Sequence, residues 1–173
     1  MKRTLGLTLL LFATLFSCMR QEKPLPAELS RAESVMWEHP DSALSILRSM
    51  PQSSLSSGKN YATWALLLAQ ARDKVYGKRL PDSLNIPFSD KLVQDAMDYF
   101  EKEGNLKRMA QTYYYKGQLL KDQKKITEAM PFFLKSKEMM TKLDEPLFTY
   151  LICQSLGNTY RYQDLYEESL VQL

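Results

Sequence analysis

A repeated spacing of small and apolar residues in the last third of the chain most constrains its fold. Two sets of five residues share one spacing: Tyr113, Gly117, Leu120, Ala129 and Phe133 in the first, and Cys153, Gly157, Tyr160, Ser169 and Leu173 in the second. In each set, the glycine and the later small residue fall on successive helices of an antiparallel pair. Two small residues there let the backbones approach closely, and residues three or four positions away fill the seam. We therefore expect paired helices.

The rest of the sequence also favours helices. The chain has 6 glycines and 8 prolines, and most of them separate segments with a helical apolar period. We expect an all-α fold of about eight helices. The expected helices cover residues 26–38, 42–50, 59–77, 89–105, two helices within 106–143, one from 146, and one from 164 that is still running at 173. Because nothing stops this last helix, we expect it to be incomplete.

Local signals place several helix ends. Asp41 follows Pro40 and is expected to cap the helix that begins at residue 42. Ser89 or Asp90 is expected to cap the next long segment after the loop at 77–87, and Gly104 is expected to end that segment. Pro131 falls inside a predicted helix, where it must kink the helix or delay its start.

The stretch "AQTYYYKGQLLKDQKKITEAMPFFLKSKEM" resembles the tetratricopeptide repeat, a helix-turn-helix unit of about 34 residues. The resemblance implies a solenoid of antiparallel helix pairs over residues 27–173, with the best repeats at 110–143 and 150–173, the latter incomplete. In the terms of that family, Gly117 and Gly157 match the glycine of close helix contact, and Ala129 and Ser169 match the small residue opposite. Phe133 matches the aromatic residue that follows.

In this family the first helix of each pair lines a concave face that binds ligands. Carried over position by position, the ligand-binding side chains would be Gln111, Tyr114, Gln118, Lys121, Gln154, Asn158 and Arg161. Amides and cations on a shared wall can hydrogen-bond the backbone of an extended peptide and attract its carboxylates. The same residue types also suit an ordinary solvated surface, and the sequence leaves both interpretations open.

The N-terminus has the pattern of an export signal. Lys2 and Arg3 precede an apolar run from about Leu5 to Phe16, which is shorter than the roughly 20 residues of a membrane-spanning helix. The run ends in Leu15-Phe16-Ser17-Cys18, which resembles a bacterial lipobox. The resemblance implies a signal peptide over 1–17, removed before Cys18, and lipid attachment to Cys18, with 18–26 as a tether. The alternative is an ordinary signal peptide with an incidental cysteine.

Composition argues against several classes of function. The chain has 23 basic and 20 acidic side chains, and two of the basic ones lie in the signal, so no basic footprint for nucleic acid remains. His39 is the single histidine and lies in a turn before Pro40. If Cys18 carries lipid, Cys153 alone remains, and its place on the helix seam predicts a buried apolar role. We expect no enzyme activity, no metal and no cofactor.

The sequence thus predicts an exported, lipid-anchored scaffold that binds protein or peptide, with the periplasmic face favoured over the cell surface. With the segments "HPDSALSIL" and "YATWALLLAQARDK", the chain is similar to tetratricopeptide-repeat lipoproteins of anaerobic gut bacteria. Many of these continue into a transmembrane helix and a DNA-binding domain. The alternative function is therefore the extracytoplasmic sensor part of a membrane-bound transcriptional regulator.

Overall fold

The computed structural model describes residues 24–76 and 89–172, and within these ranges all regular structure is helical. The α-helices are α2 (Ala27–Val35), α3 (Pro40–Ser49), α4 (Gly58–Tyr76), α5 (Asp90–Glu103), α6 (Leu106–Asp122), α7 (Ile126–Met140), α8 (Pro146–Arg161) and α9 (Tyr166–Gln172), with the 3-10 helix η2 (Gln52–Leu55) before α4. The prediction of an all-α chain is confirmed. Nowhere in the described ranges does a helix have the length and apolarity needed to cross a bilayer.

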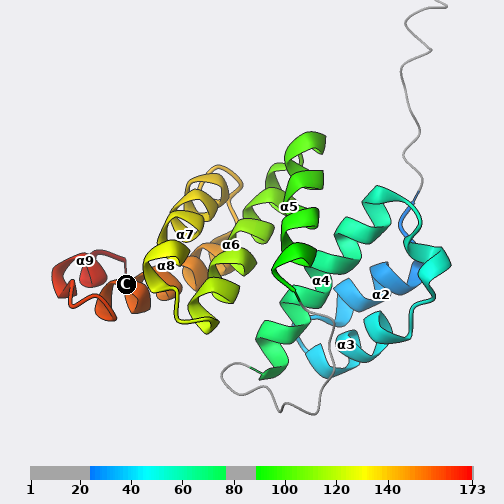
Figure 1. The fold of residues 1–173 in the computed structure, drawn as a ribbon, viewed down its shortest axis with the longest axis horizontal. Coiled ribbons are helices and arrows are strands. Elements are labelled where there is room, and N and C mark those ends of the chain that lie inside the picture. The colour runs from blue at the N-terminus through cyan, green and yellow to red at the C-terminus, as the bar shows by residue number, and fades with distance from the viewer. Residues whose placement is uncertain (1–23, 77–88, 173) are drawn as a thin grey trace, which may run out of the picture.

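The helices follow one another along the long axis of the molecule, from α2 and α3 at one end to α9 at the other (Figure 1). Each helix packs on the next one in the chain, and α2, α4, α6 and α8 also contact one another in succession. Among the described residues, α3, α5, α7 and α9 make no such contacts with each other. The helices α2, α4, α6 and α8 therefore form one continuous row, which we call the first-helix row.

The predicted boundaries of α5 agree with the structure. The Ser89 hydroxyl accepts a hydrogen bond from the backbone N–H of Leu92 at 3.3 Å. Gly104 ends the helix with a φ of 76°, a left-handed conformation that glycine adopts without strain. Asn105 then caps α6, because its side-chain oxygen accepts from the N–H of Arg108 at 3.1 Å.

The predicted cap of α3 is wrong. The helix begins at Pro40, so His39 holds the N-cap position, and no side chain caps this end. Proline is well suited to the first helical position, because its missing N–H would lack a helical partner there in any case. Asp41 thus lies inside the first turn, where its negative charge interacts favourably with the positive end of the helix dipole. The preceding helix also ends earlier than expected, at Val35, and Met36–Glu38 form a turn.

Pro131 does not delay the start of α7, which begins five residues before it at Ile126. The residue lies on the exposed side of the helix. Its missing N–H deprives only the carbonyl of Thr127 of a helical hydrogen bond. Proline is therefore accommodated within the helix.

The small residues singled out in the sequence lie at the contacts between paired helices. A Cβ atom on Gly117 would lie 2.6 Å from the ring of Phe133, which is fully buried with Ala129 on α7. In the next pair, the buried hydroxyl of Ser169 donates to the carbonyl of Gly157 at 2.9 Å. A second hydroxyl, that of Ser136, donates to the carbonyl of Ala110 at 2.7 Å. Leu173, the last member of the repeated pattern, lies outside the described residues.

Candidate functional site

Three of the predicted ligand-binding residues on α6 lie in the interior. Gln111, Tyr114 and Gln118 are all buried. The Tyr114 ring packs 5.1 Å from that of Phe148 on α8, centroid to centroid. The Gln118 amide donates to the Tyr114 hydroxyl at 2.6 Å and to the Ser155 hydroxyl on α8 at 3.3 Å. Helix α8 packs on Tyr114 and Gln118, and all three side chains are too deeply buried to contact a peptide on the surface.

The predicted residues on α8 are exposed. Gln154, Asn158 and Arg161 lie on one side of the helix, because their spacings of four and three residues bring side chains onto the same face. Lys121, at the end of α6, is half-buried. The first-helix row thus has a covered face on α6 and an open face on α8.

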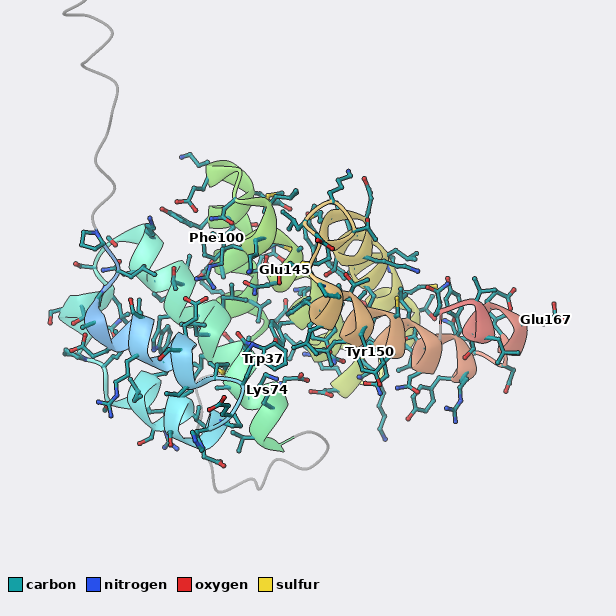
Figure 2. All side chains as sticks on the ribbon, turned by 180° about the vertical axis from the view of Figure 1, so that it is seen from behind. Trp37, Lys74, Phe100, Glu145, Tyr150 and Glu167 are labelled. Carbon is teal, nitrogen blue, oxygen red and sulfur yellow. The ribbon has the colours of Figure 1, made fainter. Side chains whose placement is uncertain are left out.

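The structure adds an aromatic and cationic pair that the sequence did not indicate. The ammonium of Lys74, on α4, lies 3.2 Å from the ring centroid of Trp37, which follows α2 (Figure 2). Trp37 is 44% exposed, and burial lowers the pKa of Lys74, an effect that Asp73 opposes. This contact joins residues far apart in the sequence, so no local pattern could have identified it.

Charged side chains gather beside this pair, at the ends of α4 and α6. Burial raises the pKa of Asp73 to about 6, against the opposing effect of Lys121. Arg72 forms an ion pair with Asp122 at 3.4 Å. Burial raises the pKa of the Tyr114 hydroxyl as well, and the nearby Asp73 adds to this effect. This end of the first-helix row therefore holds both signs of charge around a carboxyl group whose pKa is raised by burial.

A further ion pair joins α2 to α6. The Arg108 guanidinium lies 2.8 Å from the Glu33 carboxylate and 3.4 Å from the side-chain oxygen of Gln111. The backbones of α2 and α6 do not approach each other closely in the described ranges, so this ion pair bridges two helices that are not direct neighbours. The Arg108 side chain is thus directed toward α2.

The structure also places the other residues that the sequence singled out. His39 is exposed at the start of α3. Cys153 was expected to be buried, but it is half-buried beside an open pocket. Tyr113, Tyr114 and Tyr115, three consecutive residues of α6, are all buried. Across residues 24–76 and 89–172, no group of three acidic, histidine or cysteine side chains could hold a metal ion. Cys18 lies outside the described residues.

The exposed face of α8 offers amide and guanidinium groups, and the turn after α2 offers the indole of Trp37. Groups of these kinds can hydrogen-bond or stack with a polypeptide. Family models, curated proteins and solved structures were each compared with the chain, and none of them matches.

Proposed function

We propose that this chain is a lipid-anchored, non-catalytic scaffold of the tetratricopeptide-repeat kind, which binds a peptide segment of another protein outside the cytoplasm. The observation that carries the proposal is the first-helix row, which is continuous from α2 to α8 and exposes hydrogen-bonding side chains on α8. The order of contacts, in which each first helix packs on its own partner and on the next first helix, supports the resemblance seen in the sequence.

The exposed face of α8 supplies complementary chemistry for an extended peptide. Gln154 and Asn158 carry both donors and acceptors, as the backbone of a peptide does. The guanidinium of Arg161 can donate two parallel hydrogen bonds to the two oxygens of one carboxylate. At the other end of the row, the ring of Trp37 is open enough to contact an apolar or cationic side chain. A peptide long enough to span the first-helix row would contact the polar side chains of α8 at one end and the Trp37 ring at the other.

The anchor in this proposal is Cys18, which carries the lipid after removal of residues 1–17. Several acyl chains on one residue give firm attachment, because each buried methylene adds about 0.8 kcal/mol. Residues 18–26 link the anchor to α2, and the periplasmic face of a bacterial membrane is the proposed site. Growth with an alkyne-bearing palmitate tests this. The label should enter the wild type and Cys153→Ser and should be absent from Cys18→Ser; label in Cys18→Ser would refute the anchor.

Peptide binding is tested with the full-length chain in lipid nanodiscs and a displayed library of random peptides. Selected peptides are labelled, and their affinities are measured by fluorescence anisotropy. Replacing Asn158 and Arg161 by alanine removes one hydrogen-bonding group and one charged group, so we expect binding to weaken at least about tenfold.

The matched control replaces Arg48, on α3, and Gln52, in the 3-10 helix that follows, by alanine. Both side chains are exposed, and they supply the same kinds of group as Arg161 and Asn158. This variant should bind like the wild type. An equal loss in both variants, or a library that yields no binder, would contradict the proposal.

A further inference from the structure

The structure contains an open pocket beside the first-helix row, between the end of α7, the first turns of α8 and the end of α9. Its volume is about 440 Å³, and its walls include Met140, Thr149, Tyr150, Cys153, Gln154 and Gln172. Figure 2 labels Tyr150, on the second turn of α8, and Glu145, just before that helix, both of which line the pocket. Since Gln154 belongs to the exposed face of α8, the pocket adjoins the surface proposed to bind peptides.

The preceding helix pair shows what fills the equivalent space. In the spacing that matches Gly117 with Gly157, Cys153 matches Tyr113 and Gln172 matches Phe132. The rings of Tyr113 and Phe132 pack against each other there, with their centroids 6.1 Å apart, and Tyr113 is 3% exposed. In the second pair, a thiol and an amide replace these two rings, and the space remains open. The pocket therefore has the position of an aromatic cluster from which both rings are missing.

The polar surroundings of the two sites differ in charge. In the preceding pair, the Tyr113 hydroxyl accepts a hydrogen bond from Lys135 at 2.6 Å and also contacts Glu101. The pocket instead has two acidic residues at its rim, Asp144 and Glu145. Glu145 is paired with Lys107, whereas Asp144 is exposed and takes part in none of the salt bridges found in the described residues. A cationic group near the mouth of the pocket is thus favoured.

We propose that this pocket binds one aromatic side chain of the partner, with a lysine or arginine next to it facing Asp144. The inference rests on the proposed peptide-binding function, because it specifies which side chain the bound peptide contributes. An aromatic ring from the partner restores the packing that Tyr113 and Phe132 make in the preceding pair. An aliphatic side chain lacks the flat shape that the space accommodates there.

The thiol of Cys153 provides a direct readout of occupancy, because it is half-buried in the wall of the pocket. The full-length chain in lipid nanodiscs is treated with iodoacetamide, and alkylation of Cys153 is followed by mass spectrometry of the peptide that contains it. The probes are N-acetyl-Phe-Lys-amide and, as the matched control, N-acetyl-Leu-Lys-amide, each at millimolar concentration. We expect the phenylalanine probe to slow alkylation at least threefold and the leucine probe to leave the rate nearly unchanged.

Two variants at one position test the location. Gln172→Phe returns one of the missing rings, so alkylation should be slow without any probe and the phenylalanine probe should have no further effect. Gln172→Asn keeps a polar side chain and should retain the protection seen in the wild type. Equal protection by both probes, absence of protection, or continued protection in Gln172→Phe would overturn the inference. Suppose that the pocket test fails. If library peptides still bind and depend on Asn158 and Arg161, then the aromatic pocket alone is refuted. If no library peptide binds, the proposed peptide-binding function is refuted as well.

Discussion

The pairs α6–α7 and α8–α9 share one spacing of small residues, yet they differ in how much of their first helix is covered. Every residue of α6 from Ala110 to Leu120 is buried, because α4, α5, α7 and α8 all pack against it. Helix α8 contacts only α6, α7 and α9 in the described structure. Its side chains Leu147 and Tyr150 are 56% and 59% exposed.

Matched positions make the contrast specific. Tyr114 and Gln154 hold the same place relative to their glycines, as do Gln118 and Asn158. The residues on α6 are buried under α8, and those on α8 are exposed. The glycine and the small residue thus determine how two helices of a pair meet, but a neighbouring pair decides whether the other face is core or surface. The peptide binding that we propose is therefore assigned to α8–α9, the pair whose first helix is exposed.

The largest expected difference between the two pairs concerns their apolar side chains. Phe133→Ala removes a fully buried ring from the α6–α7 seam and should cost about 3–5 kcal/mol of unfolding free energy. Leu170→Ala, on α9, removes a side chain that is 73% exposed and should change stability by less than about 0.5 kcal/mol. Urea denaturation followed by circular dichroism measures both. If the two variants lost comparable unfolding free energy, Leu170 would be covered in solution, and the two helix pairs would not differ in the way described.

A smaller effect is expected from Gly117→Ala. The added methyl group would lie 2.6–3.0 Å from three ring atoms of Phe133, and the buried ring has little room to move. We expect a net cost of about 1–2 kcal/mol, because the overpacking outweighs the better helix propensity of alanine. Combining it with Phe133→Leu should relieve the clash, so the double variant should lose less than the sum of the single variants. Urea denaturation measures the unfolding free energies. If the loss in the double variant equals the sum of the two single losses, the close contact between Gly117 and Phe133 would be contradicted.

Asp73, near the end of α4, should make stability depend on pH. Its pKa is raised from 3.8 to about 6, so the folded chain holds this proton more tightly than the unfolded chain. The stability that this group contributes is present below about pH 4 and is lost as the pH rises through about 6. After allowance for partial exposure, we expect Asp73→Asn to be about 1 kcal/mol more stable than the wild type at pH 8 and equally stable at pH 4. Thermal unfolding of both proteins between pH 4 and pH 8 measures this difference in stability. A difference that does not change with pH would contradict the raised pKa of Asp73.

The loss of one buried serine hydroxyl should have a nearly equal effect in the two pairs. Ser136→Ala and Ser169→Ala each remove one buried hydroxyl that donates to a backbone carbonyl of the first helix, at 2.7 and 2.9 Å. Each should cost about 1 kcal/mol, as chemical denaturation can determine. A negligible cost for Ser169→Ala alone would mean that α9 is loosely held against α8.

Much of the fold could be predicted from the sequence, because helix pairing depends on local patterns. The apolar period, the cap at Ser89 and the stop at Gly104 are all short-range signals, and the structure agrees with them. Asp41 failed as a cap because Pro40 is itself a good first residue of a helix. The burial of Tyr114 and Gln118 could not be predicted, since it depends on Phe148 and Ser155 of a different helix. The contact of Lys74 with Trp37 is tertiary for the same reason.

Hydrogen–deuterium exchange tests the central claim, that the first-helix row binds a peptide, most directly. The full-length chain in nanodiscs is compared with and without a peptide selected from the library, and exchange is resolved by segment. We predict slower exchange over residues 146–161 of α8 and near the ends of α2 and α4, with little change in α3, α5 and α7. Protection confined to α3, α5 or α7, or absent from α8, would contradict the account.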